Sequence, residues 1–372
     1  MSIYLDYTAD TPPDERVLCE YMNAAKQHFA NPNSAHEMGV SAKKVIDDSL
    51  VKIAKLLGVS AEELILTSGA SEANNLAVKG IAWASRRRGR HIVSTFLEHS
   101  SVSGALTYLQ EQGWEIDLVN ILPSGQIDLE HLKGLLRSDT VLCAVCAVDS
   151  ELGTVQPISE IAQIVSGFEN CRLHVDMTQA VGKIPLDLTG VHTASLAPHK
   201  FYGLKGSGLL YKAKGTVIEP LIHGGASTTI YRSGTPDAPA AAAFAASMEF
   251  AVKEFGERFE RVKALNLRLR EHFAGNDRIL INSPENAVPH ILNISVSSIK
   301  GEEMRRLLDE QGVCVSVKSA CSVANTPSRP VMAMTHDRKR ALSSWRISLS
   351  HLTTDEELNK FISILDDIIG RN

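Results

Sequence analysis

A lysine in an apolar setting is the first candidate for covalent chemistry in this sequence. Lys200 directly follows His199, is bracketed by apolar residues and precedes Gly203 and Gly206. Burial lowers the pKa of an amine, and a neutral amine can form an imine with an aldehyde. We therefore expect Lys200 to be desolvated and to bind a carbonyl group covalently.

An acid and an anion-binding turn stand at the ends of two other apolar runs. Asp176 closes the run from 172 to 177, at the position where open α/β sheets bind ligands. From Leu66 to Glu72 a strand leads through small residues into a helix, which would present free N–H groups and hydroxyls to an anion. Each segment alone is also compatible with an ordinary turn or helix cap.

The three segments together supply what pyridoxal phosphate (PLP) requires of a protein. PLP needs an amine for its aldehyde, an acid beside its pyridine nitrogen and donors for its phosphate. A carboxylate at Asp176 would keep the pyridine nitrogen protonated, so that the ring accepts the electrons released when a substrate loses its Cα proton. We expect PLP to be the cofactor, bound by Lys200, and we expect no metal site.

Alternating strand and helix patterns must position these residues. Apolar runs predict strands, and amphipathic stretches between them, such as 72–85 and 128–137, predict helices. This alternation is typical of an α/β domain in which helices cover both faces of a parallel sheet. The strands are expected at residues 63–68, 91–95, 114–120, 140–148, 172–177 and 207–211.

The last third of the chain predicts a smaller α+β domain. Long helices are expected from 240 to 273, strands at 290–297, 313–317 and 345–349, and helices at 302–311 and at the C-terminus. A capping box at 354–357 starts the last helix. Because 372 residues exceed what one core serves, we expect a large PLP-binding domain over 16–255 and a small domain that combines 1–15 with 256–372.

Composition limits the class of protein further. The chain carries 38 Lys and Arg against 43 Asp and Glu, a net charge of −5 without long runs of one sign, which argues against a dedicated nucleic-acid or membrane-surface protein. No apolar stretch is long enough to span a bilayer, and the first residues lack the pattern of a secretory signal. Six scattered cysteines do not predict a disulfide framework, so a reducing cytoplasm is the expected location.

The order and spacing of these motifs resemble the cysteine desulfurases of the NifS type, in the class V aminotransferase group of fold type I PLP enzymes. The resemblance covers nearly the whole chain and includes segments 4–12, 31–36 and 97–99. It implies a PLP-dependent transferase-like α/β fold, with a mainly parallel seven-stranded sheet sandwiched by helices and a smaller α+β domain.

The same resemblance assigns roles around the cofactor. Lys200 would carry PLP, and Asp176 would pair with the pyridine nitrogen. His99 would stack on the ring and move protons, and Gln179 would contact the ring hydroxyl. The implied phosphate ligands are Ala70, Ser71, His199 and, from the second subunit of a homodimer, Thr235. Taken singly, each of the two histidines is more typical of a core residue, and Thr235 is typical of a turn. The ordered set of motifs favours the functional roles instead.

Two further residues would act on the substrate. Cys321 lies in a small-residue segment that predicts a loop, and the corresponding family cysteine attacks the substrate sulfur and becomes a persulfide. This attack requires a thiolate, which a cation such as Lys318 would favour. Arg346 resembles the arginine that binds the amino-acid carboxylate, and Asn33 is the other expected substrate contact. The alternatives are an inert thiol at Cys321 and a surface arginine at Arg346.

The remaining cysteines are expected to be inert and buried. They are Cys19, Cys143, Cys146, Cys171 and Cys314. Two positions depart from the family pattern. Ser150 stands beside the cofactor where Asn is usual, and Ala197 replaces a serine that helps to bind phosphate. The loss of one hydrogen bond to a charged group costs about 1.5 to 3 kcal/mol.

The expected function is that of a PLP-dependent cysteine desulfurase. It would remove sulfur from L-cysteine, release L-alanine and leave a persulfide on Cys321 for an acceptor protein or a tRNA-thiolation enzyme. Another PLP-dependent lyase or aminotransferase of the same fold, including a selenocysteine lyase, is an alternative. A degenerate PLP-binding regulatory protein is the alternative outside catalysis.

Overall fold

A mainly parallel seven-stranded sheet forms the centre of the larger part of the molecule. The computed structural model describes residues 2–318 and 326–371. Strand β8 is antiparallel to both of its neighbours, and the other adjacent strands are parallel, which confirms the expected α/β fold. Along the sheet the order is β2 (Leu64–Thr67), β8 (Gly208–Lys212), β7 (Thr193–Leu196), β6 (Arg172–Asp176), β5 (Thr140–Cys146), β3 (His91–Thr95) and β4 (Glu115–Val119).

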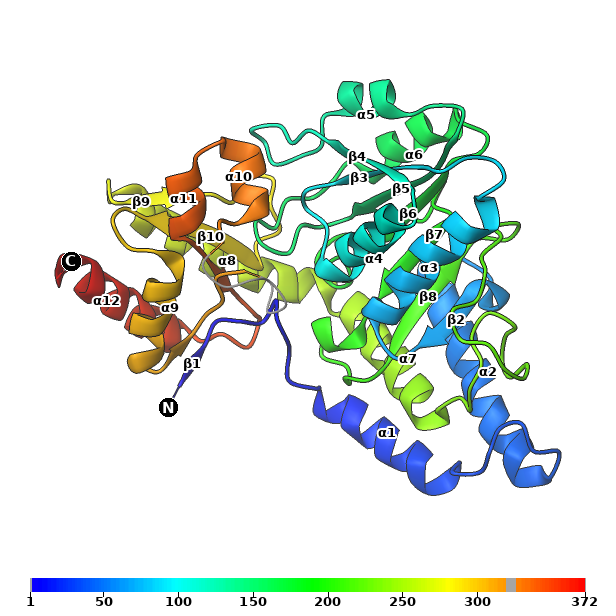
Figure 1. Ribbon diagram of the computed structural model, residues 1–372. Coiled ribbons are helices and arrows are strands. Elements are labelled where there is room, and N and C mark those ends of the chain that lie inside the picture. Colours follow the sequence, from blue (N-terminus) through cyan, green and yellow to red (C-terminus); the bar gives the residue numbers. More distant parts are fainter. Residues whose placement is uncertain (1, 319–325, 372) are drawn as a thin grey trace.

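Helices cover both faces of this sheet because its buried strands are apolar on both sides (Figure 1). On β5, Leu142 and Ala144 pack into one core, and Cys143 and Val145 pack into another. The first core includes helices α3 (Ala70–Ser85) and α4 (Ser100–Glu111). The second includes α2 (Glu37–Leu57), α5 (Leu129–Leu135), α6 (Ile158–Ser166) and α7 (Ala238–Lys253). Helix α1 (Glu15–Gln27) lies along α7.

A third hydrophobic core lies in the smaller part of the molecule. Its antiparallel sheet has the order β12 (Ser344–Ser348), β10 (Ile291–Val296) and β9 (Ile279–Ile281). The N-terminal strand β1 (Ile3–Tyr4) pairs in parallel with β11 (Val313–Cys314), so both ends of the chain contribute to this core. The helices of this part are α8 (Phe255–Ala274), α9 (Gly301–Glu310), α10 (Arg329–Thr335), α11 (Arg338–Ser343) and α12 (Asp355–Arg371).

Of two local predictions in this part, the capping box is confirmed and the length of one strand is corrected. The capping box is present, because the Thr354 N–H donates to Glu357 Oε2 at 2.9 Å and the Glu357 N–H donates to Thr354 Oγ1 at 3.1 Å. The strand expected over 313–317 was too long. It ends at Cys314, since its pairing with the short strand β1 also ends there.

The thiols follow the predicted burial with two exceptions. Cys143, Cys146 and Cys171 are buried, as expected. Cys19 is exposed because it lies on the outer face of α1, and Cys314 is half-buried. In the part of the chain that the structure describes, no helix combines the length and apolar character that crossing a bilayer demands.

Candidate active site

A cavity of about 410 Å³ opens at the carboxyl ends of the parallel strands. Asp176 ends β6, His99 follows β3 and Ser150 follows β5, so three strand ends supply its wall. Such strand ends are where open α/β sheets bind ligands. The residues expected around the cofactor and substrate that line this cavity are Ala70, Ser71, His99, Ser150, Asp176, Gln179, His199, Lys200 and Arg346.

Lys200 ends the short 3-10 helix η2 (Pro198–Lys200), which follows β7. Its ammonium group donates to the backbone carbonyl of Thr8 at 3.0 Å and to that of Ala9. Burial, together with the positive charge of Arg346, lowers the pKa of Lys200 to about 8. A useful fraction of this amine is therefore neutral and nucleophilic near neutral pH.

Asp176 is 5 % exposed and is held by donors from three directions. Its carboxylate accepts from Asn74 Nδ2 at 2.8 Å, from Ser195 Oγ at 3.2 Å and from the Thr178 N–H at 2.9 Å. Asn74 lies on α3, one helical turn after Ala70, and its oxygen in turn lies 3.0 Å from His174 Nε2. This network fixes the orientation of a buried carboxylate at the cavity wall.

His99 starts helix α4 and faces the same cavity. Its Nδ1 accepts from the backbone N–H of Ser101 at 3.2 Å, so the ring is locked as a helix cap. Burial lowers the pKa of His99, although the nearby Asp176 acts in the opposite direction. Burial also lowers the pKa of His199, to about 4. Both imidazoles are therefore neutral at physiological pH.

The N-terminus of α3 forms the anion-binding end of the cavity, with Ala70 and Ser71 in its first turn. Free N–H groups at a helix N-terminus attract a phosphate. Glu72 lies in the same turn and would repel that phosphate, but its carboxylate accepts from the Ser68 N–H at 2.7 Å and from Arg232 Nε at 3.0 Å. Arg232 therefore compensates the negative charge beside this end.

Arg346 projects from β12 of the smaller part into the cavity and is 2 % exposed, so it is not a surface arginine. Its Nη1 donates to the Ser150 carbonyl at 2.7 Å, and its Nη2 donates to Asp6 at 2.8 Å. Its Nε is buried and has no hydrogen-bond partner among the described residues.

Two expected site residues, Thr235 and Asn33, do not line this cavity. Thr235 lies in a neighbouring cavity with Ser68 and Arg232. Asn33 bonds instead to Ser227, with its Nδ2 3.1 Å from the serine Oγ. Cys321 lies outside the described residues, which resume at Thr326. Lys318, the last described residue before this gap, donates to the Thr326 carbonyl at 2.8 Å.

Several residues of the site were missed from the sequence. Asn74 and Asp6 hold Asp176 and Arg346, respectively. Glu98 is buried next to His99, and burial raises its pKa to about 8. Lys183 is a second buried lysine, which donates to Gln179. None of these residues carried a usable signal, because Lys, Glu and Asp are rarely fully buried. Even Lys183, inside the short apolar run 180–184, is expected at the surface.

The residues present fit PLP. The cavity places a desolvated lysine, an oriented carboxylate and a helix N-terminus around one space. Thr178 also lines this space with a buried hydroxyl that has no partner among the described residues. Ala197 is fully buried, and its methyl side chain cannot donate a hydrogen bond to a phosphate.

The fold and the cavity together define an α/β enzyme class built around a half-buried lysine and a buried carboxylate. Comparison with known proteins identifies the family. Residues 3–361 match the model of the family described as aminotransferase class-V. The chain belongs to this family.

Named relatives are similar over almost their whole lengths. The chain is 34 % identical to "Cysteine desulfurase IscS 1" of Archaeoglobus fulgidus, covering 99 % of this chain and 97 % of that protein. It is 36 % identical to "Cysteine desulfurase IscS" of Dictyoglomus turgidum, covering 99 % and 95 %. A solved structure titled "NIFS-LIKE PROTEIN" superposes with a TM-score of 0.94 at 35 % identity over 100 % of both chains.

Proposed function

We propose that this protein is a PLP-dependent cysteine desulfurase that converts L-cysteine to L-alanine and takes the sulfur as a persulfide on Cys321. The observation that carries the proposal is the convergence of Lys200, Asp176, His99 and Arg346 on one cavity. Full-length relatives named cysteine desulfurase support it. The stoichiometry balances, because L-cysteine and one thiol give L-alanine and one persulfide.

Each residue of the cavity has a distinct part in this reaction. When bound, PLP supplies an aldehyde that captures amines and a ring that accepts an electron pair from the substrate Cα. Lys200 would hold the cofactor and, once released, move a proton at the substrate Cα, as its lowered pKa favours. Asp176 would keep a proton on the ring nitrogen. Arg346 would bind the substrate carboxylate with its guanidinium group.

The sulfur step would use a cysteine thiolate. Cys321 would attack the substrate sulfur, and the C–S bond would break with its electron pair on the carbon side, where a proton completes L-alanine. The neutral imidazole of His99 would exchange this proton. An acceptor protein or a tRNA-thiolation enzyme would then remove the terminal sulfur from Cys321.

A pair of cysteine variants tests this route. Alanine and persulfide are measured from L-cysteine with the wild type, Cys321→Ala and Cys19→Ala. Cys19 is an exposed thiol on α1, so its variant controls for the loss of an accessible cysteine. We expect Cys321→Ala to lose both products and Cys19→Ala to retain them. Unchanged turnover in Cys321→Ala would rule out the persulfide route.

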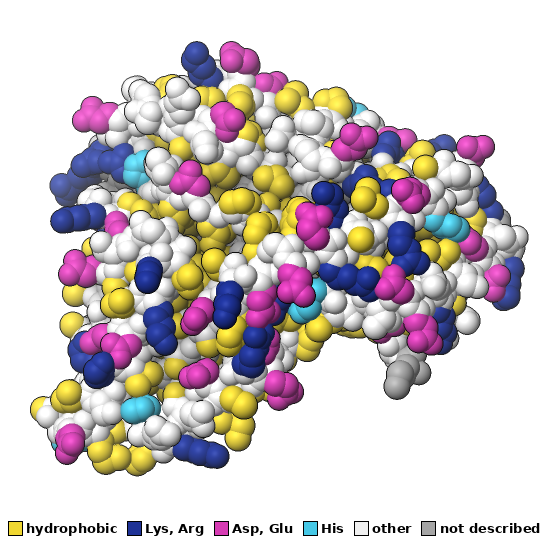
Figure 2. All heavy atoms as spheres, turned by 180° about the vertical axis from the view of Figure 1, so that it is seen from behind, with side chains coloured by type: hydrophobic (Ala, Val, Ile, Leu, Met, Phe, Trp, Pro, Cys, Tyr) yellow, Lys and Arg dark blue, Asp and Glu magenta, His cyan; other side chains and the backbone are white. Residues whose placement is uncertain are grey.

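We also propose a cytoplasmic homodimer in which Thr235 of one subunit completes the phosphate site of the other. Exposed apolar side chains near α1, α2 and the segment 222–232 support a contact of this kind. They include Met22, Phe29, Met38, Ile222 and Ile230. Figure 2 shows hydrophobic side chains at lower left, at the end of the molecule where α1 meets α2.

A further inference from the structure

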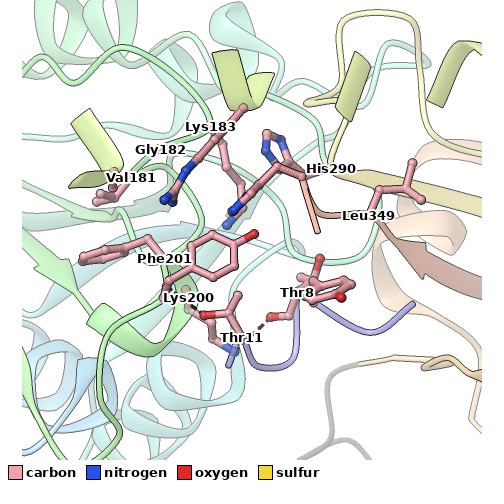
Figure 3. Close-up of a pocket in the computed structure, with 14 residues that line it drawn as sticks. Thr8, Thr11, Val181, Gly182, Lys183, Lys200, Phe201, His290 and Leu349 are labelled. Carbon is pink, nitrogen blue, oxygen red and sulfur yellow. Dashed lines mark hydrogen bonds between the residues drawn. The ribbon is translucent and has the colours of Figure 1, made fainter. Parts of the chain in front are cut away.

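A second, much smaller cavity adjoins Lys200. Its volume is about 20 Å³, enough for roughly one water molecule and too small for an amino acid. Lys200 and Thr8 line both this cavity and the large one. Lys183 and His290 lie on its wall with Lys200 (Figure 3). The side chain of Lys183 is thus next to the site but separated from any substrate in the large cavity.

Lys183 is connected to Lys200 by a continuous series of hydrogen bonds. Its ammonium group donates to Gln179 Oε1 at 2.9 Å, and Gln179 Nε2 donates to the Thr8 carbonyl at 3.0 Å. The same carbonyl accepts from Lys200 Nζ at 3.0 Å. Lys183 is only 6 % exposed, so its hydrogen bond to Gln179 Oε1 lies in a buried space.

These contacts determine which way the Gln179 amide faces. A lysine ammonium group can only donate, so the atom of Gln179 that faces it must be the oxygen. A backbone carbonyl can only accept, so the atom that faces Thr8 must be the NH₂ nitrogen. The two requirements agree, and they leave the second N–H of Gln179 available to a group in the large cavity, which Gln179 also lines.

We propose that Lys183 is a positioning residue that locks the Gln179 side chain with its NH₂ group toward the cofactor. The inference rests on the proposed function, because it assumes that PLP occupies the large cavity. Lys183 itself touches neither cofactor nor substrate. In its ammonium form it makes Gln179 a donor to the ring hydroxyl oxygen and steadies the Thr8 carbonyl that binds Lys200.

The electrostatic surroundings make Lys183 sensitive to pH as well. Burial, with the charges of Lys200 and Arg346, lowers the pKa of Lys183 to about 7. The titratable and charged groups around the small cavity are Tyr7, Lys200, Tyr202, Arg258, His290 and His351. None of these six is a carboxylate, so the ammonium form of Lys183 raises the local positive potential at Lys200.

Cofactor binding by the apoprotein tests the proposal without any substrate. The dissociation constant for PLP and the pH midpoint of the visible absorption band are measured for the wild type, Lys183→Met, Lys183→Gln, Gln179→Ala and the double variant Gln179→Ala/Lys183→Met. Lys212→Met is the matched control, because Lys212 is another buried lysine, which bonds to the Thr216 carbonyl away from the large cavity.

We expect Lys183→Met to bind PLP roughly threefold to tenfold more weakly, the equivalent of one hydrogen bond. Its pH midpoint should rise, because a nearby positive charge is removed. Lys183→Gln keeps a donor and should bind PLP nearly as well as the wild type, and Lys212→Met should match the wild type. In the Gln179→Ala background, Lys183→Met should weaken binding no further.

Two results would overturn the proposal. One is a Lys183→Met effect that persists undiminished in the Gln179→Ala background. The other is Lys183→Gln binding PLP as poorly as Lys183→Met, which would assign the effect to charge alone. The binding measurements contain no L-cysteine, so they do not depend on the proposed desulfurase activity. Absence of alanine formation would refute that activity and would leave the binding results as they are.

Discussion

At the scale of single residues, the acid at the end of β6 has the most specific role. Asp176 is almost fully buried, and its two side-chain partners, Asn74 and Ser195, act as donors toward it. A buried carboxylate with only donors around it is held in one orientation. It is therefore suited to hold a proton on the ring nitrogen of PLP.

Asp176→Asn should reduce alanine formation from L-cysteine by at least about 100-fold, because a neutral amide cannot stabilise the protonated ring nitrogen. The shape of the side chain is unchanged, so the protein should remain folded. Asp187→Asn, at an exposed position, provides the control. Activity of Asp176→Asn within a few-fold of the wild type would contradict the assigned role.

Glu98 has an effect on stability that changes with pH. Burial raises its pKa from 4.5 to about 8, and its Oε2 has no partner among the described residues. Below pH 4.5 the folded and unfolded states are both protonated. As the pH rises from 4.5 to 8, the unfolded state loses the proton and the folded state keeps it, so stability falls by up to about 1.4 kcal/mol per pH unit.

Glu98→Gln removes this titration and should gain stability relative to the wild type as the pH rises from 5 to 8. Oε1 accepts from Thr95 and from the Cys146 N–H, and the amide oxygen can keep both bonds. Urea unfolding at several pH values measures the difference, with the exposed Glu111→Gln as control. A difference that stays constant with pH would show that Glu98 is ionised in the folded protein.

Arg346→Lys should raise the KM for L-cysteine by roughly tenfold to 100-fold, the equivalent of a charge-assisted hydrogen bond. A lysine is a compact point charge and lacks the planar fork with which Arg346 bonds to Asp6 and the Ser150 carbonyl. The visible band of bound PLP should remain. Steady-state kinetics measure the change, and the exposed Arg338→Lys is the control. An unaltered KM would exclude the carboxylate contact.

At the scale of elements, strand β8 positions the phosphate end of the site. Gly208 on β8 lies against Gly69, the residue that precedes α3, and a Cβ at 208 would overlap the backbone of Gly69. The two backbones can approach this closely because residue 208 has no side chain. The antiparallel edge formed by β8 and β2 thus fixes where α3 begins.

Gly208→Ala should displace the turn at Gly69 and weaken PLP binding roughly tenfold or more, since overpacking costs about 1 to 3 kcal/mol. Titration of the apoprotein with PLP measures the loss. Gly104→Ala on α4 is the matched control, because nothing lies within 4 Å of its added Cβ. If Gly208→Ala binds PLP like the wild type, the turn does not depend on this close approach.

At the scale of the whole molecule, the site depends on two parts of the chain and, in our proposal, on two subunits. Arg346 enters from the smaller part and bonds to Ser150 of the larger part. Phe29 and Ile230 are each 72 % exposed, which is unusual for large apolar side chains. A homodimer would bury them and bring Thr235 toward the other subunit.

Light scattering should therefore give a mass of about twice 40.4 kDa for the wild type. Phe29→Asp should give monomers and weaker PLP binding, because a buried unpaired charge at the contact is costly. Leu267→Asp, on the exposed side of α8, should stay dimeric. A dimeric Phe29→Asp with normal PLP affinity would place the subunit contact elsewhere.

The sequence by itself determined the α/β fold and predicted the principal candidate residues of the site. Alternating apolar and amphipathic runs report which backbone segments are strands and helices, so six of the seven strands of the main sheet were expected. Lys200, Asp176 and the turn before α3 stand at ends of such runs, and the ends of parallel strands meet at one edge. Strand β7 escaped prediction because its residues, Thr-Ala-Ser-Leu, include only one large apolar side chain, whereas the equally short β2 is mainly apolar.

Only the tertiary structure decided the partners of these residues. Asn74 and Asp176 are 102 positions apart, and Asp6 and Arg346 are 340 apart. The bonds from Lys183 through Gln179 to Thr8 likewise join distant segments. Periodicity reports the conformation of a segment and the side it buries, whereas a hydrogen bond depends on where two folded segments meet in space.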